Sequence, residues 1–193
     1  PILFSNLTPP AEHARHFAAI ARQLAGKTRR VVISLLDLYA KSCRNLDAIP
    51  GFIYQDLLQM PNELAALLPE LAEIAQQYGM TIHGCAEDQA LSSMGIQPGK
   101  CIDEQWLNAE FGLQLAGRKD PAQRGACRCI PSVDIGQYNT CLHGCAYCYA
   151  TWNSSSAQRL LARHDPKSPL LIGSADEVPD ALRQPTIIQP SLW

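Results

Sequence analysis

Three cysteines near the end of the chain form the array most suited to chemistry. Cys141, Cys145 and Cys148 lie in the stretch CLHGCAYC, with the spacing C-x3-C-x2-C. Tight cysteine spacing of this kind is typical of iron–sulfur ligation. A cubane has four irons, so three local thiolates leave one iron open to a ligand or substrate. Gly144 lets the backbone curl around the metal without a Cβ in the way. The array therefore predicts a [4Fe-4S] cluster with an open iron.

Four other cysteines could form a second metal site, and they are Cys85, Cys101, Cys127 and Cys129. Cys85 and Cys101 lie at the ends of predicted strands or helices, where the loops of an α/β sheet converge. Cys127 and Cys129 are separated by a single residue. A four-thiolate set suits an auxiliary iron–sulfur cluster or a structural zinc ion. The alternative is that they are small buried residues without a ligand, which is our interpretation of Cys43.

The stretch CLHGCAYCYA resembles the cysteine motif of radical S-adenosylmethionine (SAM) enzymes and is especially similar to relatives of spore photoproduct lyase. The resemblance implies that the three cysteines hold a [4Fe-4S] cluster whose open iron chelates SAM, with Tyr147 near the adenine. One-electron reduction would cleave SAM to methionine and a 5′-deoxyadenosyl radical that abstracts hydrogen from a substrate. It also implies an electron donor such as flavodoxin or ferredoxin.

A longer resemblance covers nearly the whole chain, through HARHF, VVISLLDLYAK, GCAED, CIDE, KDPAQRGACRC, SVDIGQYNTCLHGCAYCYA and HDPKSPLLIG. It is similar to the bacterial family called domain of unknown function 1848, whose C-terminal cysteines are like the radical SAM set. Members of that family carry a further N-terminal region, and this chain begins at Pro1. We therefore expect that the N-terminal part of the domain is missing here. The resemblance names no substrate.

Strand and helix patterns alternate along the chain and must position these cysteines. Apolar runs predict strands, and apolar residues at helical spacing predict helices. We expect a strand end at Pro1 to Phe4, a helix capped by Thr8 that runs to Leu24, strands over Val31 to Leu36 and Met80 to Cys85, helices over Glu63 to Tyr78, Asp103 to Phe111 and Tyr149 to Arg163, and a weak strand over Cys129 to Ile135. Pro69 should kink or split the predicted helix over Glu63 to Tyr78.

This alternation predicts an α/β fold, namely part of a (β/α) barrel with about four to five βα units and a cysteine-rich C-terminal loop region. We expect one domain over residues 1–173, with the cluster loop at 127–150, and an irregular tail over 174–193. Only 45 residues follow Cys148, whereas in radical SAM enzymes the cluster loop follows the first barrel strand and most of the barrel comes after it. A barrel here would have to be permuted. The segment from Gly173 to Glu177 is a poor match for the glycine-rich strand end that binds SAM.

Polar residues also fall where strands are expected to end, and any of them could bind substrate or simply cap a helix. They are Asp37, Lys41, Glu87, Asp88, Lys119, Asp120, Gln123, Arg124 and Asp134. His143 could donate a hydrogen bond to a cluster sulfur or face water.

Composition excludes several classes of protein. Hydrophobic residues make up 47% of the chain and charged residues 18%, which is ordinary for a globular protein. No apolar run approaches the roughly 18 residues of a membrane span. The formal net charge of -2 gives no support for nucleic-acid binding. Without a secretory signal, we expect reduced thiols in the cytoplasm.

Three function classes remain open from the sequence. The first is a radical SAM-like enzyme with an unknown substrate. The second is an iron–sulfur electron carrier or sensor, which would need a fourth cluster ligand. The third is a zinc-stabilised, non-catalytic binding module. Metal analysis separates the third class from the others, and the response of a reduced cluster to SAM separates the first two.

Overall fold

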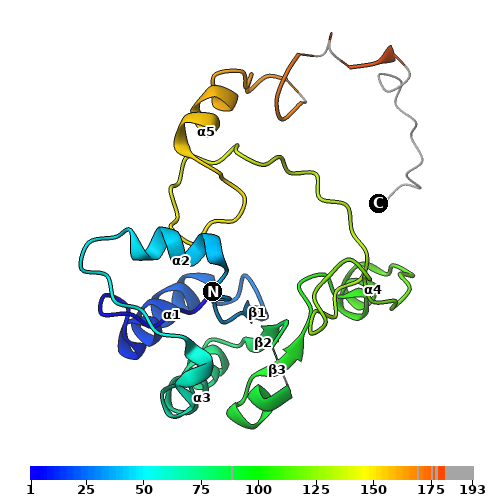
Figure 1. Ribbon diagram of the computed structural model, residues 1–193. Coiled ribbons are helices and arrows are strands. Elements are labelled where there is room, and N and C mark those ends of the chain that lie inside the picture. Colours follow the sequence, from blue (N-terminus) through cyan, green and yellow to red (C-terminus); the bar gives the residue numbers. More distant parts are fainter. Residues whose placement is uncertain (88, 169, 175, 177, 181–193) are drawn as a thin grey trace. The chain divides into compact units, whose positions relative to one another are not determined.

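The protein combines α-helices with a small parallel sheet (Figure 1). The computed structural model describes residues 1–193 except 88, 169, 175, 177 and 181–193. The α-helices are α1 (Pro10–Leu24), α2 (Ala40–Asp47), α3 (Pro61–Gln77), α4 (Glu104–Phe111) and α5 (Ser154–Leu161). The strands are β1 (Arg30–Ile33), β2 (Thr81–Cys85) and β3 (Gln97–Gly99), and two short 3₁₀ helices are η1 (Leu57–Gln59) and η2 (Gln89–Met94).

The three strands lie side by side in chain order, β1-β2-β3, and both pairings are parallel. Arg30 is opposite Thr81 in the first pair, and Cys85 is opposite Gly99 in the second. Parallel neighbours in sequence order are what consecutive βα units produce, so the predicted α/β class is confirmed. The structure does not show the predicted barrel. The sheet that the described residues form has three strands.

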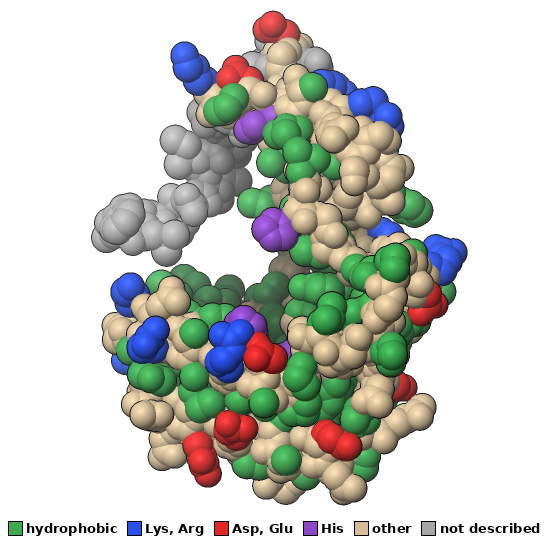
Figure 2. Space-filling view, turned by 90° about the vertical axis from the view of Figure 1, so that its left-hand side faces the viewer, with side chains coloured by type: hydrophobic (Ala, Val, Ile, Leu, Met, Phe, Trp, Pro, Cys, Tyr) green, Lys and Arg blue, Asp and Glu red, His purple; other side chains and the backbone are tan. Residues whose placement is uncertain are grey.

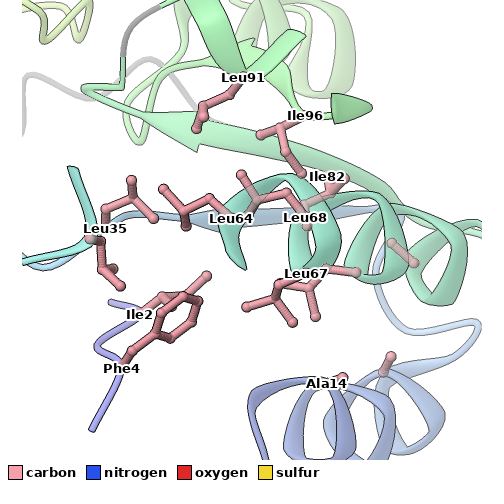
Figure 3. Close-up of a cluster of buried hydrophobic side chains, with 14 of the residues drawn as sticks. Ile2, Phe4, Ala14, Leu35, Leu64, Leu67, Leu68, Ile82, Leu91 and Ile96 are labelled. Carbon is pink, nitrogen blue, oxygen red and sulfur yellow. The ribbon is translucent and has the colours of Figure 1, made fainter. Parts of the chain in front are cut away.

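Helix α3 forms the centre of the hydrophobic core, between the sheet and α1. Leu67, Leu68 and Leu71 recur along one helix face and are almost completely buried. Figure 3 shows this face, with Leu67 on the side toward Ala14 of α1 and Leu68 close to Ile82 of β2. Burial of such side chains stabilises a fold by roughly 1.5–3 kcal/mol each. The packing holds β2 in place, and β2 ends at the first cysteine of the candidate second site.

Several sequence-based expectations about elements differ from the structure. Helix α1 begins at Pro10, and its N-cap is Pro9 rather than the predicted Thr8, without a side-chain cap hydrogen bond. Helix α3 runs through Pro69, so the predicted split is wrong, while a kink there stays a prediction. Residues 129–135 form no strand, and the backbone N–H of Ile130 and the carbonyl of Cys129 bond instead to Ile102 and Asp120. Helix α5 begins at Ser154 rather than Tyr149, because Asn153 caps it by accepting a hydrogen bond from the Ser156 N–H.

The chain divides into two compact units, Pro1–Val133 and Asp134–Trp193. The sheet and core belong to the first unit, and the C-x3-C-x2-C array and α5 belong to the second. The expected domain over 1–173 extends past this boundary and remains a prediction. Most of the expected tail over 174–193 lies outside the described residues, as do Ala175 and Glu177 of the Gly173 to Glu177 segment.

The surface carries both signs of charge. Figure 2 shows acidic and basic side chains on the same face, separated by hydrophobic and neutral ones. Within the described part of the chain, every helix is too short or too polar to cross a membrane.

Candidate metal centre

Cys85 and Cys101 meet at the carboxyl end of the sheet. Cys85 is the last residue of β2, and Cys101 follows β3 by two residues. Neighbouring parallel strands end at the same sheet edge, so their C-terminal residues converge. The Cys101 thiol donates a hydrogen bond to Cys85 Sγ at 2.8 Å. Gly99 lets β3 lie close against β2, because a Cβ there would stand 2.6 Å from the Cβ of His83.

Cys129 reaches the same point from a segment without regular secondary structure. The Ile102 N–H donates to Cys129 Sγ at 3.4 Å, and the Ile130 N–H donates to the Ile102 carbonyl at 3.3 Å. The Asp120 N–H bonds to the Cys129 carbonyl at 2.9 Å, which folds the preceding loop back on itself. These bonds fix Cys129 beside the residue that follows Cys101.

The sulfur atoms of Cys85, Cys101 and Cys129 lie within 4.8 Å of one another, so this group could hold a metal ion. Cys85 is partly buried, Cys101 is exposed and Cys129 is buried. Cys127, two residues before Cys129, is also buried. Three of the four cysteines predicted for a second site are thus gathered in one group, and the fourth, Cys127, lies outside it, two residues before Cys129 in the sequence.

The thiols of Cys85, Cys127 and Cys129 differ in how readily they ionise. Burial, followed by the hydrogen bond with Cys101, raises the pKa of Cys85 to about 12. Burial also raises the pKa of Cys127. For Cys129, burial is outweighed by the donors at its sulfur, the Ile102 N–H and the Cys127 thiol, so its pKa lies below the usual value. A bound divalent cation would supply the positive charge that several adjacent thiolates need.

The C-x3-C-x2-C array occupies a loop over residues 139–152 whose two ends are joined. The Asn139 N–H bonds to the Ala150 carbonyl at 2.9 Å, and Asn139 Oδ1 accepts from the Trp152 N–H at 2.7 Å. The Thr151 hydroxyl donates to the Cys141 carbonyl at 3.3 Å. The loop is therefore closed at its base, directly before α5.

Inside this loop, backbone donors and a left-handed glycine shape the cysteine array. The His143 N–H donates to Cys141 Sγ at 3.4 Å, and the Cys148 N–H donates to the Cys145 carbonyl at 3.0 Å. Gly144 has a φ of 73°, and a Cβ there would meet nothing within 4 Å. Glycine is thus needed for the backbone conformation rather than for space.

Cys141, Cys145 and Cys148 do not form a group as compact as the one at the sheet edge within the described residues. A cubane binds thiolates at its outer corners, so its ligands stand farther apart than those of a single ion. The assignment of a [4Fe-4S] cluster to these cysteines remains a prediction. The position of Tyr147 near an adenine also remains a prediction. Tyr147 is 42% exposed.

Several polar residues predicted at strand ends form hydrogen bonds or ion pairs within the protein. Asp37 forms an ion pair with Arg124, and Glu87 accepts a hydrogen bond from the Leu35 N–H at 2.7 Å. The carboxylates of Asp120 and Asp134 each accept a hydrogen bond from the backbone N–H two residues later. The Lys119 ammonium donates to the carbonyls of Asp120 and Gln123. Asp88 lies outside the described residues. A role for any of them in substrate binding remains a prediction.

Asn139 is a site residue that the sequence analysis did not single out. Its φ of 62° is left-handed, a conformation that Asn adopts more readily than most residues. An Asn two residues before Cys141 was a readable signal for a turn at the base of the loop.

Comparison with known proteins now identifies the family. A profile described as domain of unknown function (DUF1848) matches residues 1–150. The chain belongs to the DUF1848 family. The matched region of this DUF1848 protein contains all eight cysteines. No curated protein and no solved structure matches the chain.

Proposed function

We propose that this DUF1848 protein is an iron–sulfur enzyme that cleaves SAM reductively, with Cys141, Cys145 and Cys148 as the ligands of a [4Fe-4S] cluster. The observation that carries the proposal is a loop that presents three thiols and is closed at its own base by Asn139. Between Cys129 and the C-terminus the sequence has no fourth cysteine. Three thiolates leave one iron open, which suits binding of a small ligand better than simple electron transfer.

The donor set of the loop fits such a cluster. Cys141 is exposed, and Cys145 and Cys148 are partly buried, so the sulfurs are accessible to a metal. The Cys141 sulfur accepts the His143 N–H, and hydrogen bonds to cluster sulfurs tune reduction potential. The open space at Gly144 leaves room on that side of the loop for a bound group. When bound, the cluster would supply the electron that breaks the carbon–sulfur bond of SAM.

The chain's own residues would then orient and shield the reacting molecules, as proteins do for cofactor chemistry. The closed base of the loop holds the three ligands in one arrangement before the cluster is assembled. Tyr147 presents a partly exposed ring next to the third cysteine, where it could stack on a nucleobase. We propose this role for Tyr147 from its position and from the resemblance of the motif to radical SAM enzymes.

Electron paramagnetic resonance of the reduced cluster tests the proposal. The full-length protein is reconstituted anaerobically with iron and sulfide, and spectra are recorded with and without SAM. We expect SAM to change the spectrum, because ligand binding at an iron alters its electronic environment. With a strong reductant, the protein should also release 5′-deoxyadenosine and methionine slowly.

Two single variants provide the matched comparison. Cys145→Ala should abolish the SAM response and the release of 5′-deoxyadenosine, whereas Cys43→Ala, which changes a partly buried cysteine of α2, should leave both intact. An intact cluster whose spectrum is unchanged by SAM would refute the enzyme proposal and favour an electron carrier or sensor. A cluster that survives the loss of Cys145 would refute the ligand assignment.

A further inference from the structure

We propose that Cys85, Cys101, Cys127 and Cys129 bind one zinc ion as four thiolates, in a structural site whose ligands are distinct from those of the iron–sulfur loop. The starting observation is that segments distant in sequence bring three of these sulfurs within 4.8 Å of one another. Two come from adjacent strand ends, and the third is held by the Ile102 N–H. In a protein with free thiols, such convergence is typical of metal ligation.

The spacing of the sulfurs favours a single ion over an iron–sulfur cluster. Zinc–thiolate bonds are about 2.3 Å long, so two ligands of a tetrahedral zinc ion stand about 3.8 Å apart. The three sulfurs within 4.8 Å are near this separation. A cubane at the same place would require all of them to move outward. Zinc is the common ion for tetrahedral all-thiolate sites in proteins.

Cys127 completes the ligand set. Cys127 and Cys129 are separated by one residue in a segment without helix, so their side chains can lie on the same side of the chain. Both are buried, with exposed fractions of 5% and 7%. A rotation of the Cys127 side chain toward the other sulfurs would close the tetrahedron.

The surroundings also suit a thiolate-bound cation. Four thiolates around one Zn²⁺ ion carry a net charge of minus two, which nearby donors and cations must stabilise. The Ile102 N–H already donates to one sulfur, and the positive charge of Lys119 acts on Cys127. The Lys119 ammonium is held nearby by the carbonyls of Asp120 and Gln123.

The ion would have a structural role. It would join the ends of β2 and β3 to residues 120–130, a segment that has no helix or strand of its own. Closed coordination by four protein ligands leaves no position for a substrate, so this site stabilises the fold while the iron–sulfur loop is proposed to do the chemistry.

Cobalt substitution tests the number of thiolates. Cys127→Ser and Cys43→Ser proteins are compared with wild type after zinc is replaced by Co²⁺, whose absorption reports tetrahedral geometry and thiolate ligands. We expect a four-thiolate spectrum in wild type and Cys43→Ser, and a weaker thiolate charge-transfer band in Cys127→Ser. An identical spectrum in Cys127→Ser would overturn Cys127 as a ligand.

A measurement on the unchanged protein covers the case in which a variant fails to fold. Alkylation of each cysteine is followed by mass spectrometry before and after zinc is removed with a chelator. Removal should accelerate alkylation of Cys85, Cys101, Cys127 and Cys129 but not of Cys43. Equal rates for the four before and after chelation, or a protein purified without zinc, would overturn the site.

The zinc site can be tested independently of the proposed enzyme activity. In a protein with Cys141, Cys145 and Cys148 all changed to Ala, we expect the loss of the iron–sulfur cluster and retention of one zinc ion per chain. Iron and sulfide remaining in that variant would overturn the zinc assignment by placing a cluster at the sheet edge. Loss of SAM cleavage alone would not contradict the zinc assignment.

Discussion

Cys141, Cys145 and Cys148 share one loop, whereas Cys85, Cys101 and Cys129 come from segments that only the fold brings together. The first group depends on short-range bonds such as the one between Asn139 and Trp152. The second depends on the pairing of β2 with β3 and on a core centred on α3. A ligand set within one loop can be assembled by local structure, while a dispersed set requires that the domain be folded. The two groups should therefore respond differently to the same disturbance.

Loss of zinc should have the largest effect on stability, and it should affect the first unit. For Cys129→Ala, we expect a loss of about 4 kcal/mol at a free zinc concentration about 1,000 times the dissociation constant, because a ligand that binds only the folded state stabilises it by mass action. Chemical denaturation with and without a zinc chelator measures this difference. Cys43→Ala is the matched control, and its stability should remain as sensitive to the chelator as that of wild type. A chelator-insensitive wild type would contradict the prediction.

A cavity in the core should have an effect of similar size on stability. Leu68 is fully buried on α3, and Leu68→Ala should destabilise the first unit by about 2–5 kcal/mol. It should also weaken zinc binding, because the positions of β2 and β3 depend on this core. Leu142→Ala, at an exposed leucine of the cysteine loop, should change stability by less than about 0.5 kcal/mol. Equal losses in the two variants, measured by denaturation, would show that the core assignment is wrong.

The closed base of the cysteine loop should matter locally. Asn139→Ala removes the acceptor of the Trp152 N–H and places Ala in a left-handed conformation, at a cost of about 1–3 kcal/mol. We expect faster loss of iron to a chelator, with zinc binding unchanged. Asn139→Gly restores the backbone conformation but not the hydrogen bond, so it should lose iron at an intermediate rate. Iron release at the wild-type rate in both variants would contradict a role for Asn139.

The smallest predicted effect is a change in pH dependence. Burial raises the pKa of Glu87 above its ordinary value of 4.5, although the Leu35 N–H opposes the shift. A carboxyl group with a raised folded pKa binds its proton more tightly when folded, so stability falls as the pH rises from the ordinary value through the raised one. Glu87→Gln keeps an acceptor for Leu35 and should flatten this decline. Denaturation at a series of pH values measures it, and an unchanged slope would refute the prediction.

Local patterns were enough to predict the elements whose sequence signal agrees with their environment. The apolar run before Cys85 predicted β2, and the leucines of Glu63 to Tyr78 predicted α3. Pro69 was expected to kink or split α3, yet the helix continues through it. The flanking Leu67, Leu68 and Leu71 are buried, and their packing outweighs the roughly 3 kcal/mol that a proline costs within a helix.

Other features depend on contacts between distant residues and could not be derived from local patterns. The segment 129–135 looked like a weak strand, but its first residues bond to Ile102 and Asp120 instead of a neighbouring strand. The grouping of Cys129 with Cys85 and Cys101 follows from these bonds. Sequence spacing could suggest a second metal site, but it could not decide which sulfurs meet.

Metal analysis tests most directly whether the two cysteine groups hold different metals, as proposed here. Iron, sulfide and zinc are measured in anaerobically reconstituted wild type, in a Cys141→Ala, Cys145→Ala, Cys148→Ala protein and in a Cys85→Ala, Cys129→Ala protein. We predict a [4Fe-4S] cluster and one zinc ion in wild type, zinc alone in the triple variant, and iron without zinc in the double variant. Loss of both metals in the triple variant, or retention of the cluster there, would contradict the claim.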